Sequence, residues 1–112
     1  MEKTICISGI DVPFKATAGT IRRYRAKFQK DLILDMQELQ RQASSGLELT
    51  ADALLTFEDV AYIMAKQADP TIPDDPDEWL DRFEMFSIYH VLPELVTLWG
   101  LSVQTLENSK KK

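Results

Sequence analysis

The sequence predicts a mainly α-helical domain of three to four helices with a β-hairpin at its N-terminus. Two observations lead to this fold class. β-Branched residues are concentrated in two short segments on either side of a turn at residues 9–11, as in a hairpin. After them, apolar residues recur every three to four positions over long stretches, which is the period of an amphipathic helix.

The hairpin is expected within residues 1–17, with strands at 3–8 and 12–17. An isolated hairpin is marginally stable in water, so this one must pack against the helices that follow. Cys6 alternates with Ile5 and Ile7, and a free cysteine is usually a small buried apolar residue. We therefore expect a buried, unreactive thiol.

One long helix is expected from an N-cap at Thr20 to a stop at Gly46. Ile33 and Leu34 are apolar but lie off its main stripe. Four cations fall on the side opposite the stripe: Arg23, Lys27, Lys30 and Arg41. The stripe itself follows the helical period for about six turns: Ile21, Tyr24, Phe28, Leu32, Met36, Leu39 and Ala43.

A second helix is expected at residues 51–68, with Thr50 or Thr56 as alternative caps. Its residues are apolar nearly all round, which is typical of a central helix covered on several sides.

A proline-rich loop at residues 69–76 separates this helix from a third one. Asp75 as cap, Pro76 at the first position and Glu78 in the first turn predict a strong helix start. Apolar residues then continue to Gly100, and Trp79, Phe83 and Phe86 line one face. Pro93 predicts either one kinked helix or two short ones. Residues 1–101 are expected to form one domain, and the polar tail at 102–112 is expected to be disordered.

The composition excludes several classes of function. The chain has 112 residues, a net charge of −5, one cysteine and one histidine, so neither an internal disulfide nor a cysteine-based zinc site can form. The acidic balance argues against broad nucleic-acid binding, and no apolar run approaches the ~20 residues that span a bilayer. The N-terminus lacks the pattern of a signal peptide, which indicates a reducing cytoplasm.

No motif indicates catalysis or a cofactor. The acidic run at residues 74–78 lacks the spacing of a calcium loop and fits the positive end of the following helix, so capping is preferred over a metal site. His90 has no motif-defined partner, although Glu94 lies one turn further on, and a helix-surface or half-buried histidine is the preferred interpretation. We expect no enzyme.

The basic cluster at residues 22–30 has three interpretations. It can contact nucleic acid, dock an acidic protein, or simply keep a helix face solvated. Tyr24 and Phe28 interleave with the cations, but both lie on the apolar stripe and are expected in the core.

Three stretches together resemble the tail assembly chaperones of long, non-contractile-tailed phages and prophages of Gram-positive bacteria. They are PFKATAGTIRRYRAKFQKDL at 13–32, FEDVAYIMAKQADP at 57–70, and the run from Glu78 to Leu101 that includes EWL, FEMF and LWGL. They cover most of residues 12–101. The resemblance implies a non-catalytic factor of the host bacterial cytoplasm, without cofactor, that binds the tape measure protein and keeps it soluble while tail tube protein polymerises around it. Such a factor is absent from the finished virion.

The family often adds a longer product made by ribosomal frameshifting, through which tail tube protein can be bound. The lysine run at 110–112 would suit a slippery site.

The hypothesis for the binding surface rests on Ile33 and Leu34, flanked by Arg23, Lys27, Lys30 and Arg41. The same surface could instead mediate self-association. The alternative function is a structural or connector protein incorporated into the virion tail, and a small nucleic-acid-binding regulator is a third option.

Overall fold

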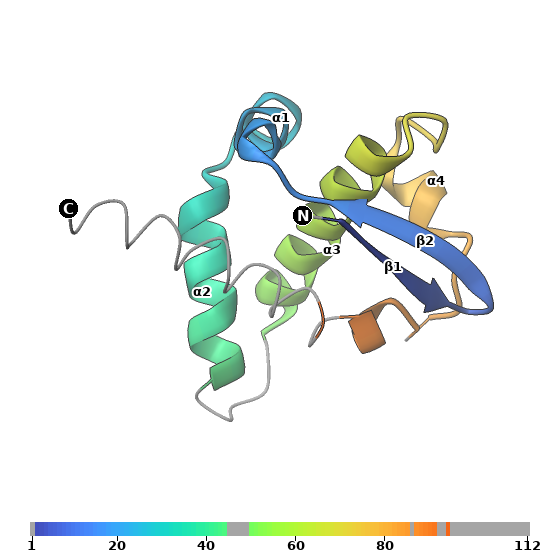
Figure 1. The fold of residues 1–112 in the computed structure, drawn as a ribbon. Helices are drawn as coiled ribbons and strands as arrows, with labels where there is room; N and C mark the ends of the chain where they lie inside the picture. The colour runs from blue at the N-terminus through green and yellow to red at the C-terminus, as the bar shows by residue number, and fades with distance from the viewer. Residues whose placement is uncertain (1, 45–49, 86, 92–93, 95–112) are drawn as a thin grey trace.

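The computed structural model describes residues 2–44, 50–85, 87–91 and 94. It confirms a mainly α-helical domain with an N-terminal hairpin. Figure 1 shows the hairpin crossing the central helix, with further helices to either side. The elements are β1 (Glu2–Ile7), β2 (Ile10–Lys15), α1 (Ala18–Phe28), α2 (Leu32–Ser44), α3 (Ala51–Ala68), α4 (Pro76–Leu80) and the 3-10 helix η1 (Ser87–Val91).

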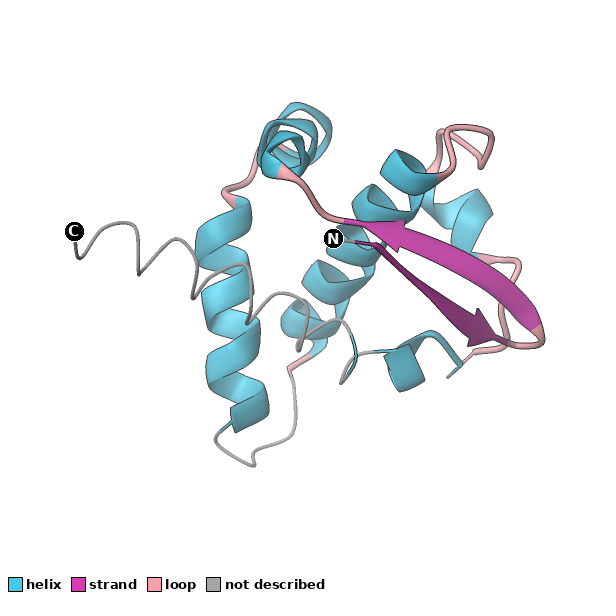
Figure 2. Cartoon of the chain, viewed as in Figure 1, coloured by secondary structure: helices cyan, strands magenta, loops and turns pink. Residues whose placement is uncertain are grey.

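The hairpin closes through a two-residue turn at Ser8 and Gly9. Both residues have positive φ, 52° and 79°, as the twist of a tight hairpin requires. The pairing therefore begins at Ile7 opposite Ile10. Compared with the predicted turn at residues 9–11, β1 ends one residue earlier and β2 begins two residues earlier. The two strands form a single ribbon beside the helices in the described chain (Figure 2).

One face of the ribbon is buried and the other is open to solvent. Ile5, Ile7, Val12 and Phe14 point into the core. Because side chains alternate along a strand, Cys6 between the two isoleucines lies on the open face. The expectation of a buried cysteine is wrong.

The long helix expected from Thr20 to Gly46 is in fact two helices, α1 and α2. Gln29 adopts the left-handed conformation, with φ 60°, and its N–H bonds to the carbonyl of Arg25, which ends α1. Asp31 then caps α2, because its Oδ1 accepts from the N–H groups of Ile33 and Leu34 at 3.0 and 3.2 Å. In Figure 1 α1 is seen almost along its axis, whereas α2 lies across the view. The predicted stop at Gly46 lies outside the described residues.

The cap of α1 is Thr17, not Thr20. Thr20 stands at the third helical position, where its hydroxyl accepts from the N–H of Thr17 at 2.9 Å and completes a capping box. The same hydroxyl donates to Gln67 Oε1 at 2.5 Å, and Gln67 Nε2 donates to Thr17 Oγ1 at 2.6 Å. The start of α1 is thereby joined to the end of α3.

The predicted central helix is confirmed as α3. Thr50 is its cap and accepts from the N–H of Ala53 at 3.1 Å, so the alternative cap at Thr56 is not used. α3 packs against β2, α1, α2 and α4. Eight of its side chains are buried: Ala53, Phe57, Val60, Ala61, Tyr62, Ile63, Met64 and Ala65.

The third predicted helix is much shorter than expected. Asp75 and Pro76 start α4 as predicted, and Trp79 is buried, but the helix ends at Leu80. The N–H of Glu84 donates to Ser8 Oγ of the hairpin turn at 3.1 Å, instead of continuing a helical ladder. The chain resumes regular structure only in η1. Phe86, Pro93, the continuation to Gly100 and the tail at 102–112 lie outside the described residues.

None of the helices in the described ranges is both long enough and apolar enough to cross a membrane.

Candidate protein-binding surface

The six side chains of the predicted surface do not lie along one helix. Arg23 and Lys27 belong to α1, Lys30 to the connection, and Ile33, Leu34 and Arg41 to α2. Since the chain changes direction at Gln29, the periodicity of one helix no longer relates them.

Lys27 is engaged within the molecule. Its ammonium group donates to the carbonyl oxygen of Asp74 at 2.6 Å and lies 5.9 Å from the ring centroid of Tyr62. The second distance is within the range of a cation–π contact. Lys27 therefore fastens α1 to the proline-rich loop.

Lys30 also has an internal partner. Its ammonium nitrogen lies 3.8 Å from Asp59 Oδ2 on α3. Burial raises the pKa of the Asp59 carboxyl, and the positive charge of Lys30 opposes that rise. The lysine thus helps to keep a half-buried carboxylate ionised.

Arg41 forms a two-pronged ion pair on the surface of α2. Its Nε donates to Glu38 Oε2 at 3.0 Å and its Nη2 to Glu38 Oε1 at 2.5 Å. The hydrogen bonds from Arg41 lower the pKa of Glu38 to about 2. Both side chains are exposed, so the pair adds little stability.

The remaining three residues differ in exposure. Arg23 is exposed on α1, with its guanidinium group over Gly19. Ile33 is half-buried, whereas Leu34 is 62% exposed. Of the predicted apolar contacts, Leu34 is therefore the available one, and its contact with a partner stays a prediction.

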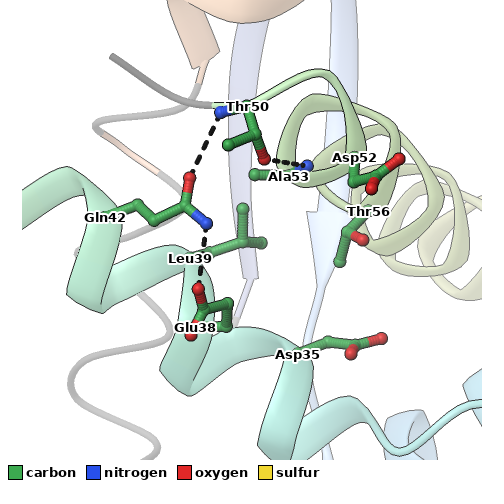
Figure 3. Close-up of a pocket in the computed structure, with 8 residues that line it drawn as sticks. All are labelled: Asp35, Glu38, Leu39, Gln42, Thr50, Asp52, Ala53 and Thr56. Atoms are coloured by element: carbon green, nitrogen blue, oxygen red, sulfur yellow. Dashed lines mark hydrogen bonds between the residues drawn. The ribbon is translucent and has the colours of Figure 1, made fainter. Parts of the chain in front are cut away.

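The structure also places a groove between α2 and α3 that the sequence did not indicate. Its volume is about 270 Å³. Figure 3 shows the two helices contributing its walls, with Leu39 and Ala53 as the buried apolar part. Eight residues line it: Asp35, Glu38, Leu39, Gln42, Thr50, Asp52, Ala53 and Thr56.

The rim of this groove is acidic and partly ordered by hydrogen bonds. Gln42 Nε2 donates to Glu38 Oε1 at 2.9 Å, and Gln42 Oε1 accepts from the N–H of Thr50 at 3.2 Å (Figure 3). The hydroxyl of Tyr24 donates to Asp35 Oδ2 at 2.7 Å. The face between α2 and α3 therefore carries negative charge, whereas the predicted surface was cationic. Asp35 and Asp52 were missed because their meeting requires α2 to fold back against α3.

The other candidate residues are the acidic run at 74–78 and His90. Asp75 caps α4, and Asp74 Oδ1 pairs with Lys66 Nζ at 2.8 Å, so the acidic run has a structural role at both positions. His90 is exposed in η1. Within the described residues, no group of three or more histidine, cysteine, aspartate or glutamate side chains could hold a metal ion.

No family model, curated protein or solved structure matches the chain.

Proposed function

We propose that the protein is a non-catalytic tail assembly chaperone, which binds the tape measure protein and keeps it soluble during assembly of the tail tube. The observation that carries the proposal is the resemblance of three stretches spread over residues 12–101. The first stretch runs from β2 through α1 to the start of α2. The second covers α3 from Phe57 to its end, and the third begins in α4. The proposal places the protein in the host bacterial cytoplasm and outside the mature virion.

An exposed apolar contact of the kind that such a chaperone needs is present on α2. Leu34 is 62% exposed, and Leu55 on α3 is 54% exposed. Each directly precedes a residue that lines the groove, Asp35 and Thr56 respectively. A long helical partner in an aqueous compartment exposes apolar side chains, and covering them with leucines removes that surface from water.

The test is co-expression with the tape measure protein of the same phage or prophage. We expect this protein to raise the soluble fraction of the tape measure protein and to be recovered with it in a pull-down. A tape measure protein that stays insoluble and unbound would contradict the proposal.

The alternative is a structural or connector protein of the virion tail, which also needs apolar docking surface. Mass spectrometry of purified particles separates the two. A chaperone is absent from the particles, whereas a connector is present at fixed stoichiometry.

A further inference from the structure

The outer edge of β1 is not paired with another strand within the described part of the chain, although η1 packs against β1. Ile7 and Ile10 close a two-residue turn and so form a hydrogen-bonded pair, after which bonded and non-bonded pairs alternate along an antiparallel ladder. The backbone groups of Glu2, Thr4 and Cys6 consequently point away from β2. Among the described residues, no hydrogen bond engages these outward groups.

The outer edge of β2 is protected, in contrast. Its outward positions are Asp11, Pro13 and Lys15. Pro13 has no N–H to offer, and the charges on either side of it oppose the approach of another strand. Over Thr4–Ile7, β1 has neither a proline nor a charge, and Thr4 and Cys6 are exposed. Among the described residues, a proline stands at an outward position only on the edge of β2.

We propose that β1 pairs antiparallel with β1 of a second copy, so that two hairpins form a four-stranded sheet across a two-fold axis. In the proposed register, Thr4 of one copy faces Thr4 of the other, and Glu2 faces Cys6. This register pairs all three outward residues of each strand, whereas a shift by two residues loses a pair. It places no like charges opposite each other, and threonine pairs are favourable across strands. A second copy fits because the edge is self-complementary in this register.

The dimer is independent of the proposed chaperone activity. It uses the hairpin edge, and it involves neither Leu34 nor the groove between α2 and α3. Failure of either proposal therefore leaves the other standing.

The first test is analytical ultracentrifugation of the full chain over a range of concentrations. We expect a concentration-dependent dimer for the wild type. Thr4→Pro removes an outward N–H without removing a bond of the hairpin, and we expect the dissociation constant to rise about tenfold or more. Asp11→Pro is the matched control, because it removes an outward N–H from the edge of β2, and it should dimerise like the wild type.

If Thr4→Pro disturbs folding, a second variant and a cross-linking experiment still test the dimer. Thr4→Lys leaves the backbone unchanged and places two lysines opposite each other, so the dimer should weaken about tenfold at low salt and recover partly at high salt. In a Cys6→Ser background, Thr4→Cys should be bridged by a short bismaleimide, because paired Cα atoms lie about 5.5 Å apart. Asp11→Cys in the same background should not be bridged. A wild type that is monomeric at every concentration, or a dimer that survives folded Thr4 variants, overturns the proposal.

Discussion

At the scale of single residues, the tyrosine hydroxyls hold the helices to their neighbours. Tyr24 donates to Asp35, Tyr62 to the carbonyl of Pro73 at 2.6 Å, and Tyr89 to Glu58 Oε1 at 2.6 Å. Burial, followed by the hydrogen bond to Asp35, raises the pKa of Tyr24 far above its usual value. The hydrogen bond to Glu58, followed by burial, raises the pKa of Tyr89 to about 12. All three phenols therefore favour the protonated form in the folded state, since burial also raises the pKa of Tyr62.

These shifts predict a loss of stability at alkaline pH. A raised folded pKa contributes stability that is fully present below the unfolded value of 10.0 and is lost as pH rises through the folded pKa. Urea unfolding between about pH 7 and pH 12 should therefore give a free energy of unfolding that falls above about pH 10. Tyr24→Phe should flatten that fall and cost about 1–2 kcal/mol at pH 7, because Asp35 loses a donor. An alkaline fall of the same slope in Tyr24→Phe would contradict the assignment to Tyr24.

At the scale of elements, the break between α1 and α2 is produced by two residues with different roles. Gln29 ends α1 in a left-handed conformation that costs a residue with a Cβ roughly 1–2 kcal/mol. Asp31 then recovers part of that cost by capping α2. The strain at Gln29 is thus a fixed feature of the connection, and it can be relieved by a residue without a side chain.

Gln29→Gly should stabilise the protein by up to about 1 kcal/mol, because glycine adopts the left-handed conformation without penalty. Chemical denaturation measures the change. The matched control is Gln37→Gly, which changes an exposed glutamine inside α2 and should destabilise by about 1 kcal/mol. Destabilisation by both variants would show that the side chain of Gln29, which donates to the carbonyl of Ala26 at 3.2 Å, contributes more than the backbone strain costs.

The sequence predicted some elements well because their signals are local. The hairpin, α3 and the start of α4 are specified by β-branched runs, helical period and capping residues close together in the chain. The break at Gln29 was missed because the apolar stripes of α1 and α2, such as Tyr24 and Met36, face one common core and preserve the period across it. Asp31 before an apolar run was the available signal. The early end of α4 involves a hydrogen bond between Glu84 and Ser8, which local pattern cannot reveal.

At the scale of the whole molecule, Lys27, Lys30 and Arg41 of the predicted binding surface have acidic or carbonyl partners that were not predicted from the sequence. The negative partners of Lys27 and Lys30 come from the proline-rich loop and from α3. These partners are distant in sequence and come close to the lysines only in the folded protein. The pattern of residues along one helix therefore could not predict them. What remains open on the α2 side is Leu34 together with an acidic groove. We therefore expect the partner to place basic groups against the acidic groove and an apolar side chain against Leu34.

Leu34→Asp therefore tests whether α2 contacts the tape measure protein. Because Leu34 is 62% exposed, we expect the free energy of unfolding to change by no more than about 0.5 kcal/mol. Loss of one buried leucine contact should weaken recovery in a pull-down about tenfold. Gln37→Asp is the matched control, since it adds the same charge to an exposed position one turn along the same helix and should leave binding unchanged. If Leu34→Asp binds the tape measure protein as well as Gln37→Asp does, Leu34 on α2 is not the contact. If the wild type also binds, the chaperone proposal stands, and Leu55→Asp on α3 is the next variant to test.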